Sequence, residues 1–379
     1  MIYFDHAATS PLCASAREAL IRWQELYFNS SSQYQAAMPV REAVESARAD
    51  FARQLHSEAY EIYFTSGATE SNNWAFFSAL HQPRRPGKHI LISSIEHPSV
   101  RECAFFYRRQ GFELELIPVD TDGRIDLDFL RQHLRADTCL VSIMAVNNEV
   151  GTIQDLEAIS EILRNSSALF HCDAVQAFPY IPLEMDRLAI DLLSLSAHKF
   201  NGPKGVGLLY MRESKRRELE LPAMLYGGPQ ERERRAGTSP VPLVAAMAAA
   251  LSEKLDKFSE DLAHLRVLSQ ALEAGLRDRF PDCRIHCRSE FRHPGHLNVS
   301  IPGLSGETAL IALDMAGFCV SHGSACASGS LDPSPVLLAM GASRDEAQSS
   351  LRFSFGASNQ LEEVDLLLTE LENLRAWNL

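Results

Sequence analysis

The sequence predicts an α/β fold built around a mostly parallel sheet. Short apolar runs typical of strands alternate with helical patterns through the first half of the chain. Several of these runs end in polar side chains, as strands that border a ligand site do. The 379 residues, 46% hydrophobic and 22% charged, are typical of a globular protein with about two or three domains and a large core.

The composition argues against several classes of protein. With 36 basic and 49 acidic residues the net charge is -13, which disfavours a nucleic acid or an anionic membrane as partner. No window approaches the roughly 18 apolar residues of a membrane-spanning helix. Residues 1–6 lack the features of a signal peptide, so we expect a cytoplasmic protein. The eight cysteines are scattered, and we expect free thiols.

The N-terminal part predicts a short strand and two helices. A strand at the start of residues 3–11 runs into a polar turn, and a helical segment from Cys13 to about Leu26 precedes a loop at 28–32. Residues 40–55 carry apolar side chains at helical spacing, with charges on the opposite face. We expect this second helix to pack on a larger body.

Residues 61–74 predict a strand, a glycine turn and a helix that starts near Ala68. Backbone amides and the Thr69 hydroxyl at the helix start would face an anion, as a phosphate site requires. A plain helix cap is the alternative for a single Ser/Thr-rich turn. The position directly after a strand favours the binding site.

The central part predicts five further strands and the helices between them. The strands are expected at 89–93, 114–119, 140–146, 169–173 and 192–195, and the helices at 99–110, 126–134 and 158–165. Polar residues follow four of the strands: His97, Asn147 to Glu149, Asp173 and Lys199. Because ligands of open α/β sheets bind outside the carboxyl ends of the strands, one pocket could collect these side chains.

Lys199 lies in the turn between two apolar runs, with Ser196 and His198 beside it. Such a lysine suits a Schiff base with an anchored phosphate cofactor. An exposed lysine in a tight turn is the alternative and is the commoner case for such a turn taken alone. Asp173 could keep a pyridinium nitrogen protonated, or it could simply cap a helix, and Gln176 could donate to a ring hydroxyl. Together, Asp173 and Lys199 point to pyridoxal phosphate.

The sequence of the C-terminal part predicts a smaller domain of helices and strands. Residues 241–276 are rich in Ala and Leu with Glu/Lys pairs, and we expect them to include the long helix that links the domains. Strands are expected at 284–287, 297–301 and 351–355, and helices at 307–315 and 362–376.

A group of cysteines and histidines in this part loosely matches a zinc site: Cys283, His286, Cys287, His293 and His296. The usual loop of about a dozen residues between ligand pairs does not fit between Cys287 and His293. We therefore interpret these as structural or surface residues and predict no metal.

Cys326 lies in a stretch of small residues that includes Gly323 and Gly329. Such a stretch predicts a mobile loop with an accessible thiol. A buried thiol is the usual alternative and fits the apolar runs of Cys139, Cys172 and Cys319. No Lys or Arg lies within ten residues of Cys326, so its activation must come from a tertiary neighbour, from His322 or from the bound substrate.

Taken together, the motifs resemble the cysteine desulfurase family. They lie at 64–71, 146–151, 171–176, 198–205, 235–240 and 321–330, in family order, and the resemblance runs from Asp5 to Phe355. It implies the fold-type I architecture of pyridoxal phosphate enzymes, a large domain with a mostly parallel seven-stranded sheet and a smaller α+β domain. We expect the large domain at 13–257 and the small one, which carries the Cys326 loop, at 1–12 and 258–379.

The resemblance also implies roles for individual residues. Lys199, Cys326 and His97 look catalytic, with Lys199 bound to the cofactor and His97 stacked on its ring. Arg352 resembles the residue that holds the substrate α-carboxylate, a task for which a guanidinium is well suited. Asn148 and Asn29 are assigned to the substrate with it. The cofactor-binding set is Ala68, Thr69, Asn148, Asp173, Gln176, Ser196, His198, Lys199 and Thr238, the last contributed by the other subunit.

The implied activity is the conversion of L-cysteine to L-alanine, with the sulfur held as a persulfide on Cys326. A homodimer would pass that sulfur to an acceptor or scaffold protein, for iron-sulfur cluster assembly or thiolation. A selenocysteine lyase or cysteine sulfinate desulfinase would use the same residues. A non-catalytic sulfur-carrier scaffold that has kept the fold is the alternative from another class.

Overall fold

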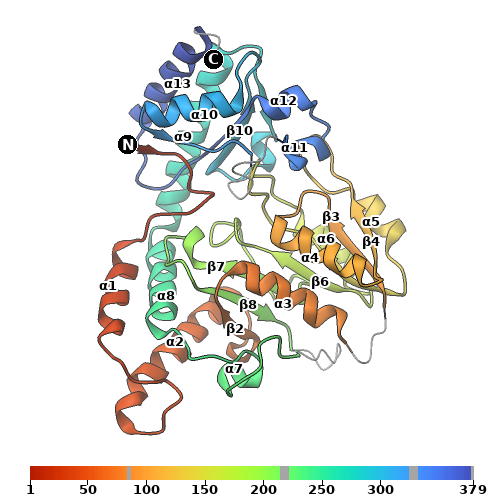
Figure 1. The fold of residues 1–379 in the computed structure, drawn as a ribbon, viewed down its shortest axis with the longest axis vertical. Helices are drawn as coiled ribbons and strands as arrows, with labels where there is room; N and C mark the ends of the chain where they lie inside the picture. The colour runs from red at the N-terminus through yellow and green to blue at the C-terminus, as the bar shows by residue number, and fades with distance from the viewer. Residues whose placement is uncertain (83–86, 214–221, 324–331, 377–379) are drawn as a thin grey trace.

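The computed structural model describes residues 1–82, 87–213, 222–323 and 332–376 (Figure 1). A seven-stranded sheet lies at the centre of the larger part of the molecule. In spatial order its strands are β2 (Ile62–Thr65), β8 (Gly207–Met211), β7 (Leu192–Ser196), β6 (Leu169–Asp173), β5 (Thr138–Ser142), β3 (His89–Ser93) and β4 (Glu113–Ile117). The predicted α/β class with a mostly parallel sheet is confirmed.

Five neighbouring strands, from β7 to β4, run parallel, whereas β8 is antiparallel to both β7 and β2. Successive residues face opposite sides of the sheet, as in any strand. In β3, for example, Leu91 joins one hydrophobic cluster while Ile90 and Ile92 join another. Both faces are therefore covered, which explains why these strands read as continuous apolar runs.

Helices cover the two faces. The larger cluster includes residues of α2 (Met38–Gln54), α6 (Leu156–Leu163) and α8 (Val241–Asp256), with α1 (Ala14–Gln24) packed against it. The other face is covered by α3 (Ala68–Leu80) and α4 (Pro98–Arg109). A further helix, α5 (Leu127–His133), precedes β5, and the short α7 (Gln230–Glu233) precedes α8.

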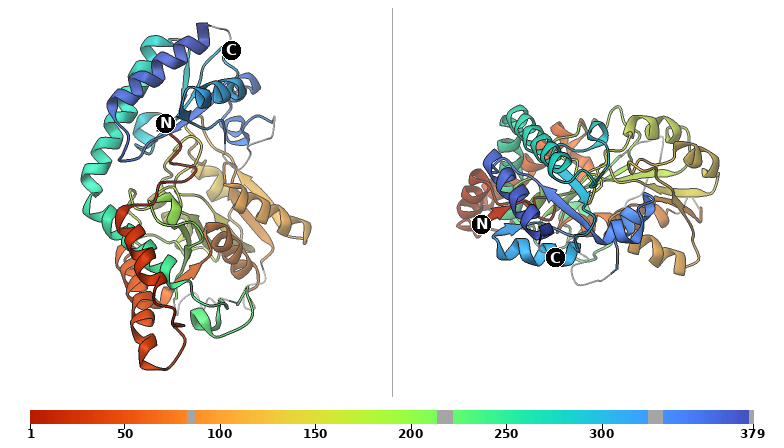
Figure 2. Two further views of the ribbon diagram at one scale, coloured as in Figure 1. Left: turned by 60° about the vertical axis from the view of Figure 1, so that its left-hand side comes forward. Right: turned by 90° about the horizontal axis from the view of Figure 1, so that it is seen from above.

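The smaller part contains a three-stranded antiparallel sheet with the order β12 (Ser350–Ser354), β10 (His296–Ser300) and β9 (Arg284–His286). The strand β1 (Ile2–Tyr3) pairs with β11 (Phe318–Cys319), so the N-terminus lies beside the C-terminal part of the chain (Figure 1). The helices of this part are α9 (Phe258–Arg279), α10 (Gly306–Met315), α11 (Pro335–Ala339), α12 (Arg344–Gln348) and α13 (Leu361–Ala376), and α9 and α13 lie side by side (Figure 2).

The smaller part has a hydrophobic cluster of its own, which includes Phe4 from the N-terminal segment and Leu272, Phe353 and Leu367 from the C-terminal part. This separate cluster supports our proposal of a large domain at 13–257 and a small domain at 1–12 and 258–379.

The helical stretch predicted for 241–276 is not one helix. It breaks at Lys257, where φ is -104° and ψ is 8°, into α8 and α9. The break lets α8 stay on the large cluster while α9 packs on the small one, and the buried Lys254 and Asp261 pair across it at 2.7 Å. Sequence periodicity missed this bend because both helices are amphipathic and well formed on either side of it.

Smaller differences concern the ends of elements and the thiols. The strand β5 ends at Ser142 rather than at residue 146, and the short helices α11 and α12 were not predicted. Cys139 and Cys172 are buried as expected, whereas Cys319 is only half-buried because β11 pairs on one side with a two-residue strand. The cysteines within the described ranges are all free thiols. None of the helices in those ranges is long and apolar enough to span a membrane.

Candidate active site

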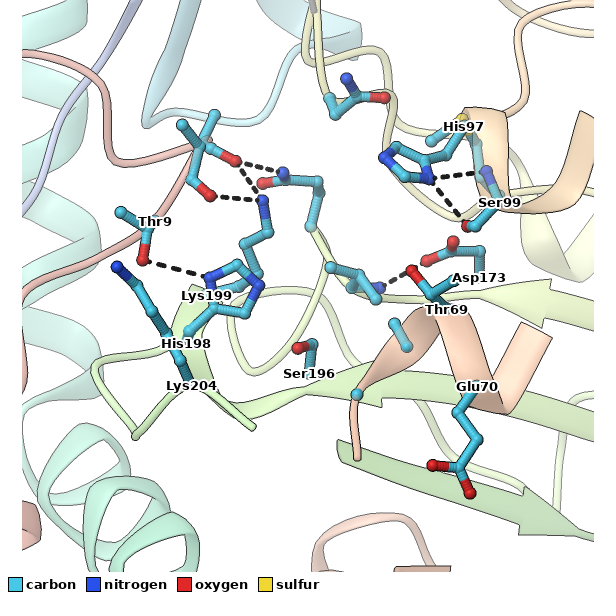
Figure 3. Close-up of a pocket in the computed structure, with 18 of the residues that line it drawn as sticks. Thr9, Thr69, Glu70, His97, Ser99, Asp173, Ser196, His198, Lys199 and Lys204 are labelled. Carbon is cyan, nitrogen blue, oxygen red and sulfur yellow. Dashed lines mark hydrogen bonds between the residues drawn. The ribbon is translucent and has the colours of Figure 1, made fainter. Parts of the chain in front are cut away.

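A pocket of about 590 Å³ opens where the parallel strands end (Figure 3). Most of the residues that the sequence singled out line it. These are Ala68, Thr69, His97, Asn148, Asp173, Gln176, Ser196, His198, Lys199 and Arg352. They come from the ends of β3, β5, β6 and β7, from the start of α3 and from β12. The fold therefore brings together side chains that are up to 284 residues apart, from Ala68 to Arg352.

Lys199 ends a single 3-10 turn, Ala197–Lys199, directly after β7. Its Nζ donates to the backbone oxygens of Ala7, at 2.5 Å, and Ala8, at 2.9 Å. The Gln176 side chain also donates to Ala7 O, at 2.8 Å. The N-terminal segment thus crosses the pocket and holds the lysine within it, a contact that the sequence did not reveal because it uses backbone carbonyls.

Asp173 ends β6 and is only 4% exposed. Its Oδ1 accepts from the backbone N of Val175 at 3.1 Å, and its Oδ2 accepts from Asn72 Nδ2 at 2.8 Å. A donor on each oxygen fixes the plane of the carboxylate. An aspartate held in this way on the pocket wall can keep a ring nitrogen protonated.

His97 caps the N-terminus of α4. Its Nδ1 accepts from the backbone N of Ser99 at 3.1 Å and lies 2.7 Å from Ser99 Oγ. Burial lowers the pKa of His97 below its usual value; the nearby Asp173 opposes this, whereas Lys199 and Arg101 add to it. At neutral pH the ring is neutral, and it faces the pocket as a flat group that can stack on another ring.

The start of α3 forms a cradle for an anion. Gly67 precedes this helix with φ of 153°, a value that side chains with a Cβ rarely adopt. A Cβ on Gly207 would lie 2.6 Å from the Gly67 Cα, so two glycines let the backbones meet below the pocket. The first amides of this 13-residue helix, together with Thr69, Ser196 and His198, face the same space.

Two titratable groups border the cradle. Burial, with Lys199 and Lys204 nearby, lowers the pKa of His198 to about 4, so its ring is neutral at neutral pH, and its Nδ1 lies 3.1 Å from Thr9 Oγ1. Burial alone would raise the pKa of Glu70, but hydrogen bonds from Arg235 and Ser66 outweigh it and lower that pKa. The Glu70 charge is thus taken up by Arg235, at 2.8 Å, and does not oppose an anion.

Arg352 lies in the middle of β12 and is 1% exposed. Its Nη1 donates to Asn148 O at 3.0 Å, and its Nη2 donates to Asp5 Oδ1 at 2.5 Å and to Ser321 Oγ at 2.9 Å. Its Nε is buried and has no hydrogen-bond partner within the described part of the chain. A guanidinium that is held in place and belongs to the pocket wall can receive a carboxylate.

Three predicted residues are not among those that line the pocket. Asn29 is exposed, and its Oδ1 accepts from the backbone N of Ser31 at 2.9 Å. Thr238 is also exposed. Cys326 lies outside the described residues.

The candidate zinc residues make contacts with other protein groups. His286 Nε2 lies 2.7 Å from Ser300 Oγ, and the Nδ1 atoms of His293 and His296 are 3.1 Å apart. Burial lowers the pKa of His293 to about 4. The other ring nitrogens, His286 Nδ1, His293 Nε2 and His296 Nε2, are buried without a hydrogen-bond partner within the described residues, and the structural role of this group stays a prediction.

Sequence reasoning missed several residues of the pocket wall. Ser66, Glu70 and Lys204 lie inside motifs already singled out, so their position gave a signal. Ser99 and the segment from Ala7 to Thr9 gave none, because their approach depends on tertiary packing.

The arrangement fits a planar ring that carries a phosphate. The helix start would hold the phosphate, Asp173 and Gln176 the ring edge, and His97 its face, while Lys199 can bind covalently. Arg352 lines the same pocket, and its guanidinium would be a suitable partner for a carboxylate.

Comparison with known proteins gave full-length matches. The family described as aminotransferase class-V matches residues 2–367. The cysteine desulfurase IscS of Methanosarcina thermophila is 40% identical, over 97% of this chain and 90% of that protein. A NifS-like protein of known structure has a TM-score of 0.92 with 35% identity over 99% of both chains. SspA, solved in complex with cysteine, has a TM-score of 0.81 with 31% identity over 94% of this chain and 99% of its own.

Proposed function

This chain belongs to the class-V aminotransferase family and, within it, to the cysteine desulfurases, and from that premise we propose that it converts L-cysteine to L-alanine with pyridoxal 5'-phosphate. One observation carries the proposal. Lys199, Asp173 and His97 border a single pocket whose floor is the N-terminus of a buried helix. This set of groups matches the requirements of that cofactor.

Different residues of this chain would hold different parts of the cofactor. The amides at the start of α3, with Thr69, Ser196 and His198, hold the phosphate, and Gln176 donates to the ring oxygen. When bound, the cofactor supplies an electron sink that stabilises negative charge at the substrate Cα. Asp173 keeps a proton on the ring nitrogen, which that sink requires, and the neutral ring of His97 excludes water from one face.

Lys199 would anchor the cofactor and move the substrate proton. Its Nζ removes the proton from Cα and returns a proton to the carbon skeleton. The Ala7 and Ala8 carbonyls hold Nζ inside the pocket, where such a transfer takes place. Arg352 binds the substrate α-carboxylate, with Asn148 beside it, so that the Cα–H bond is presented to the lysine.

The sulfur would be removed by Cys326. Its thiolate attacks the substrate sulfur, an S–S bond forms and the bond between sulfur and Cβ breaks. The carbon fragment keeps the electron pair of that bond, takes up a proton and leaves as alanine, while the persulfide stays on Cys326. An acceptor protein, a scaffold for iron-sulfur cluster assembly or a thiolation partner then receives the sulfur.

We also propose a homodimer in which each pocket is completed by Thr238 of the partner subunit. The exposure of Thr238 and its position outside its own pocket support this arrangement. Arg235, three residues earlier, is fixed to Glu70 at the start of α3, so the segment that carries Thr238 begins beside a pocket. Tyr226, 83% exposed, belongs to the same region of the chain.

Product analysis tests the proposed reaction. Incubation of the cofactor-loaded protein with cysteine, selenocysteine and cysteine sulfinate, with alanine as the measured product, separates the candidate activities. We expect alanine from cysteine, and loss of the visible cofactor band and of alanine formation in Lys199→Ala. Alanine from selenocysteine or the sulfinate but not from cysteine would assign the site to those substrates. A protein that binds no cofactor and forms no alanine would support the non-catalytic scaffold instead.

A further inference from the structure

Asn72 lies on α3, and its side chain is fully buried beside two residues of the pocket wall. Its Nδ2 is 2.8 Å from Asp173 Oδ2 and 2.8 Å from Ser99 Oγ. An amide nitrogen carries two hydrogens, so this one group can donate to both acceptors at once. It is the shared donor between a residue that ends β6 and one that begins α4.

The amide fits in only one orientation. The reverse orientation would place Oδ1 against the Asp173 carboxylate, so that two acceptors would face each other. In the orientation found, Oδ1 is buried without a hydrogen-bond partner among the residues described. A buried acceptor left unpaired destabilises the fold, which offsets much of the stability gained from the two hydrogen bonds. The clearest effect of Asn72 is therefore on the orientation of its two neighbours.

Ser99 transmits this orientation to His97. Both the backbone N and the Oγ of Ser99 lie within hydrogen-bond distance of His97 Nδ1, at 3.1 and 2.7 Å. Because Ser99 Oγ accepts from Asn72, its own hydrogen is available for Nδ1. The proton of the neutral ring is then on Nε2, the nitrogen that Figure 3 shows turned toward the pocket.

We propose that Asn72 is a positioning residue that couples the Asp173 carboxylate to the His97 ring through one amide group. The inference rests on the proposed function, because these two residues would contact the edge and the face of the same cofactor. Asn72 itself acts only through them. Their alignment with each other is thus set by a side chain outside the pocket wall.

The neighbouring Asn73 provides a matched control. It lies on the same helix, is only partly buried, and donates to Thr69 O at 2.8 Å within that helix. We expect Asn72→Ala to keep the fold. Its kcat for alanine formation should fall about tenfold, and it should bind the cofactor about tenfold more weakly. Losses of this size follow the removal of hydrogen bonds to the ligating residues of metal sites. The KM for cysteine should change little, and the visible band of the bound cofactor should shift. Asn73→Ala should match the wild type in each respect.

Two further variants sharpen the test. Asn72→Asp keeps the shape of the side chain but turns an oxygen toward Asp173, so it should lose at least as much as Asn72→Ala without leaving a cavity. Ser99→Ala and the double variant with Asn72→Ala complete a mutant cycle, in which members of one relay lose far less together than the sum of their single effects. Ser99→Thr, which retains the hydroxyl, should recover most of the activity.

The proposal would be overturned if the losses of activity in the mutant cycle were additive. It would also be overturned if the Asn72 variants had the visible cofactor band, the cofactor affinity and the kcat of the wild type. Equal losses in Asn72→Ala and Asn73→Ala would overturn it as well. The wild-type protein separates this failure from that of the proposed function. If it binds no cofactor, the proposed function is wrong and the relay with it; if it binds cofactor and only the variants are indifferent, the relay alone is wrong.

Discussion

At the residue scale, the pocket depends on buried polar side chains whose hydrogen bonds are nearly complete. Arg352 is the clearest case, because a guanidinium that is 1% exposed must be held by partners. Asp5, Ser321 and the Asn148 carbonyl provide them, and Nε is left over. Because Arg352 also lines the pocket, we propose its guanidinium as the partner of the substrate carboxylate.

Arg352→Lys tests this assignment. A lysine keeps the charge but loses the planar fork, so we expect the KM for cysteine to rise about tenfold or more while kcat changes less. Steady-state kinetics measures the split, and thermal melting shows whether the fold is intact. Arg284→Lys is the control, since Arg284 lies on β9 of the same sheet but outside the pocket lining, and it forms a half-buried ion pair with Glu346. An unchanged KM in Arg352→Lys would remove Arg352 from the substrate site.

How far the site follows from the sequence also depends on the residue. Lys199, Asp173 and His97 lie at or just after strand ends, so the rule for open α/β sheets sufficed to place them together. Asn72 and Ser99 lie on helices, and nothing in their local pattern indicates that they meet. The contacts of Lys199 with the Ala7 and Ala8 carbonyls could not be predicted from side-chain patterns, because they use backbone atoms.

At the element scale, the start of α3 depends on backbone contact between two glycines. A Cβ at Gly207, on β8, would lie 2.6 Å from the Gly67 Cα and 2.7 Å from the Leu195 oxygen. These are backbone atoms of rigid strands and of the helix start, so they cannot give way cheaply. The close approach sets the distance between the sheet and the helix end that would hold the phosphate.

Gly207→Ala should therefore weaken cofactor binding. We expect a loss of stability of about 1–3 kcal/mol from the forced backbone shift, together with a rise of the cofactor Kd. Titration of the apoprotein with the cofactor measures the Kd. Gly111→Ala is the matched control, because its φ of 93° strains an alanine but no atom lies near its Cβ, and it is remote from the pocket. Gly111→Ala should lose stability but retain its affinity for the cofactor. If both variants bound the cofactor equally well, the contact between Gly207 and Gly67 would have no role in cofactor binding.

The elements themselves were largely predictable, since the buried strands and the amphipathic helices each have a strong period. The prediction failed where tertiary packing decides. The chain bends at Lys257 because α8 packs on one hydrophobic cluster and α9 on the other. The spacing of apolar residues does not indicate which cluster a helix packs on. The five-residue helices α11 and α12 are too short for a period to be visible.

At the scale of the whole molecule, the pocket lies between two bodies. Lys199 and Asp173 come from the seven-stranded sheet, whereas Arg352 comes from the three-stranded sheet and Ala7 from the N-terminal segment beside it. The residues proposed for the cofactor and the residue proposed for the substrate carboxylate thus come from different sheets. On the proposed function, the packing of the two parts of the fold against each other would set the distance between the cofactor and the substrate carboxylate.

Buried histidines should make the molecule sensitive to acid. Burial lowers the pKa from 6.5 to about 4 for His6, His171, His198, His286 and His293. Below pH 6.5 the unfolded chain binds protons at these sites and the folded chain does not, so stability falls as the pH drops from about 6.5 to about 4. Each such histidine contributes at most about 1.4 kcal/mol per pH unit within that window.

Urea unfolding of the protein at a series of pH values checks this. In His171→Gln the decline should be shallower, because His171 lies between Ser142 and Ser194 in the sheet and is fully buried. His56→Gln, at a half-exposed side chain, is the control for the loss of an imidazole as such. A free energy of unfolding that stays constant from pH 7 to about 4 would contradict the account.

We propose that this chain removes sulfur from cysteine and holds it on Cys326. The most direct measurement is a short incubation of the cofactor-loaded protein with cysteine in the absence of reductant, with alanine quantified and the sulfur located by peptide mass spectrometry. We predict alanine together with a peptide in which Cys326 has gained one sulfur atom, and in Cys326→Ala an intact cofactor band without appreciable alanine, because only the nucleophile is lost. Full desulfuration by Cys326→Ala, or a persulfide found on Cys319 or another cysteine, would contradict it.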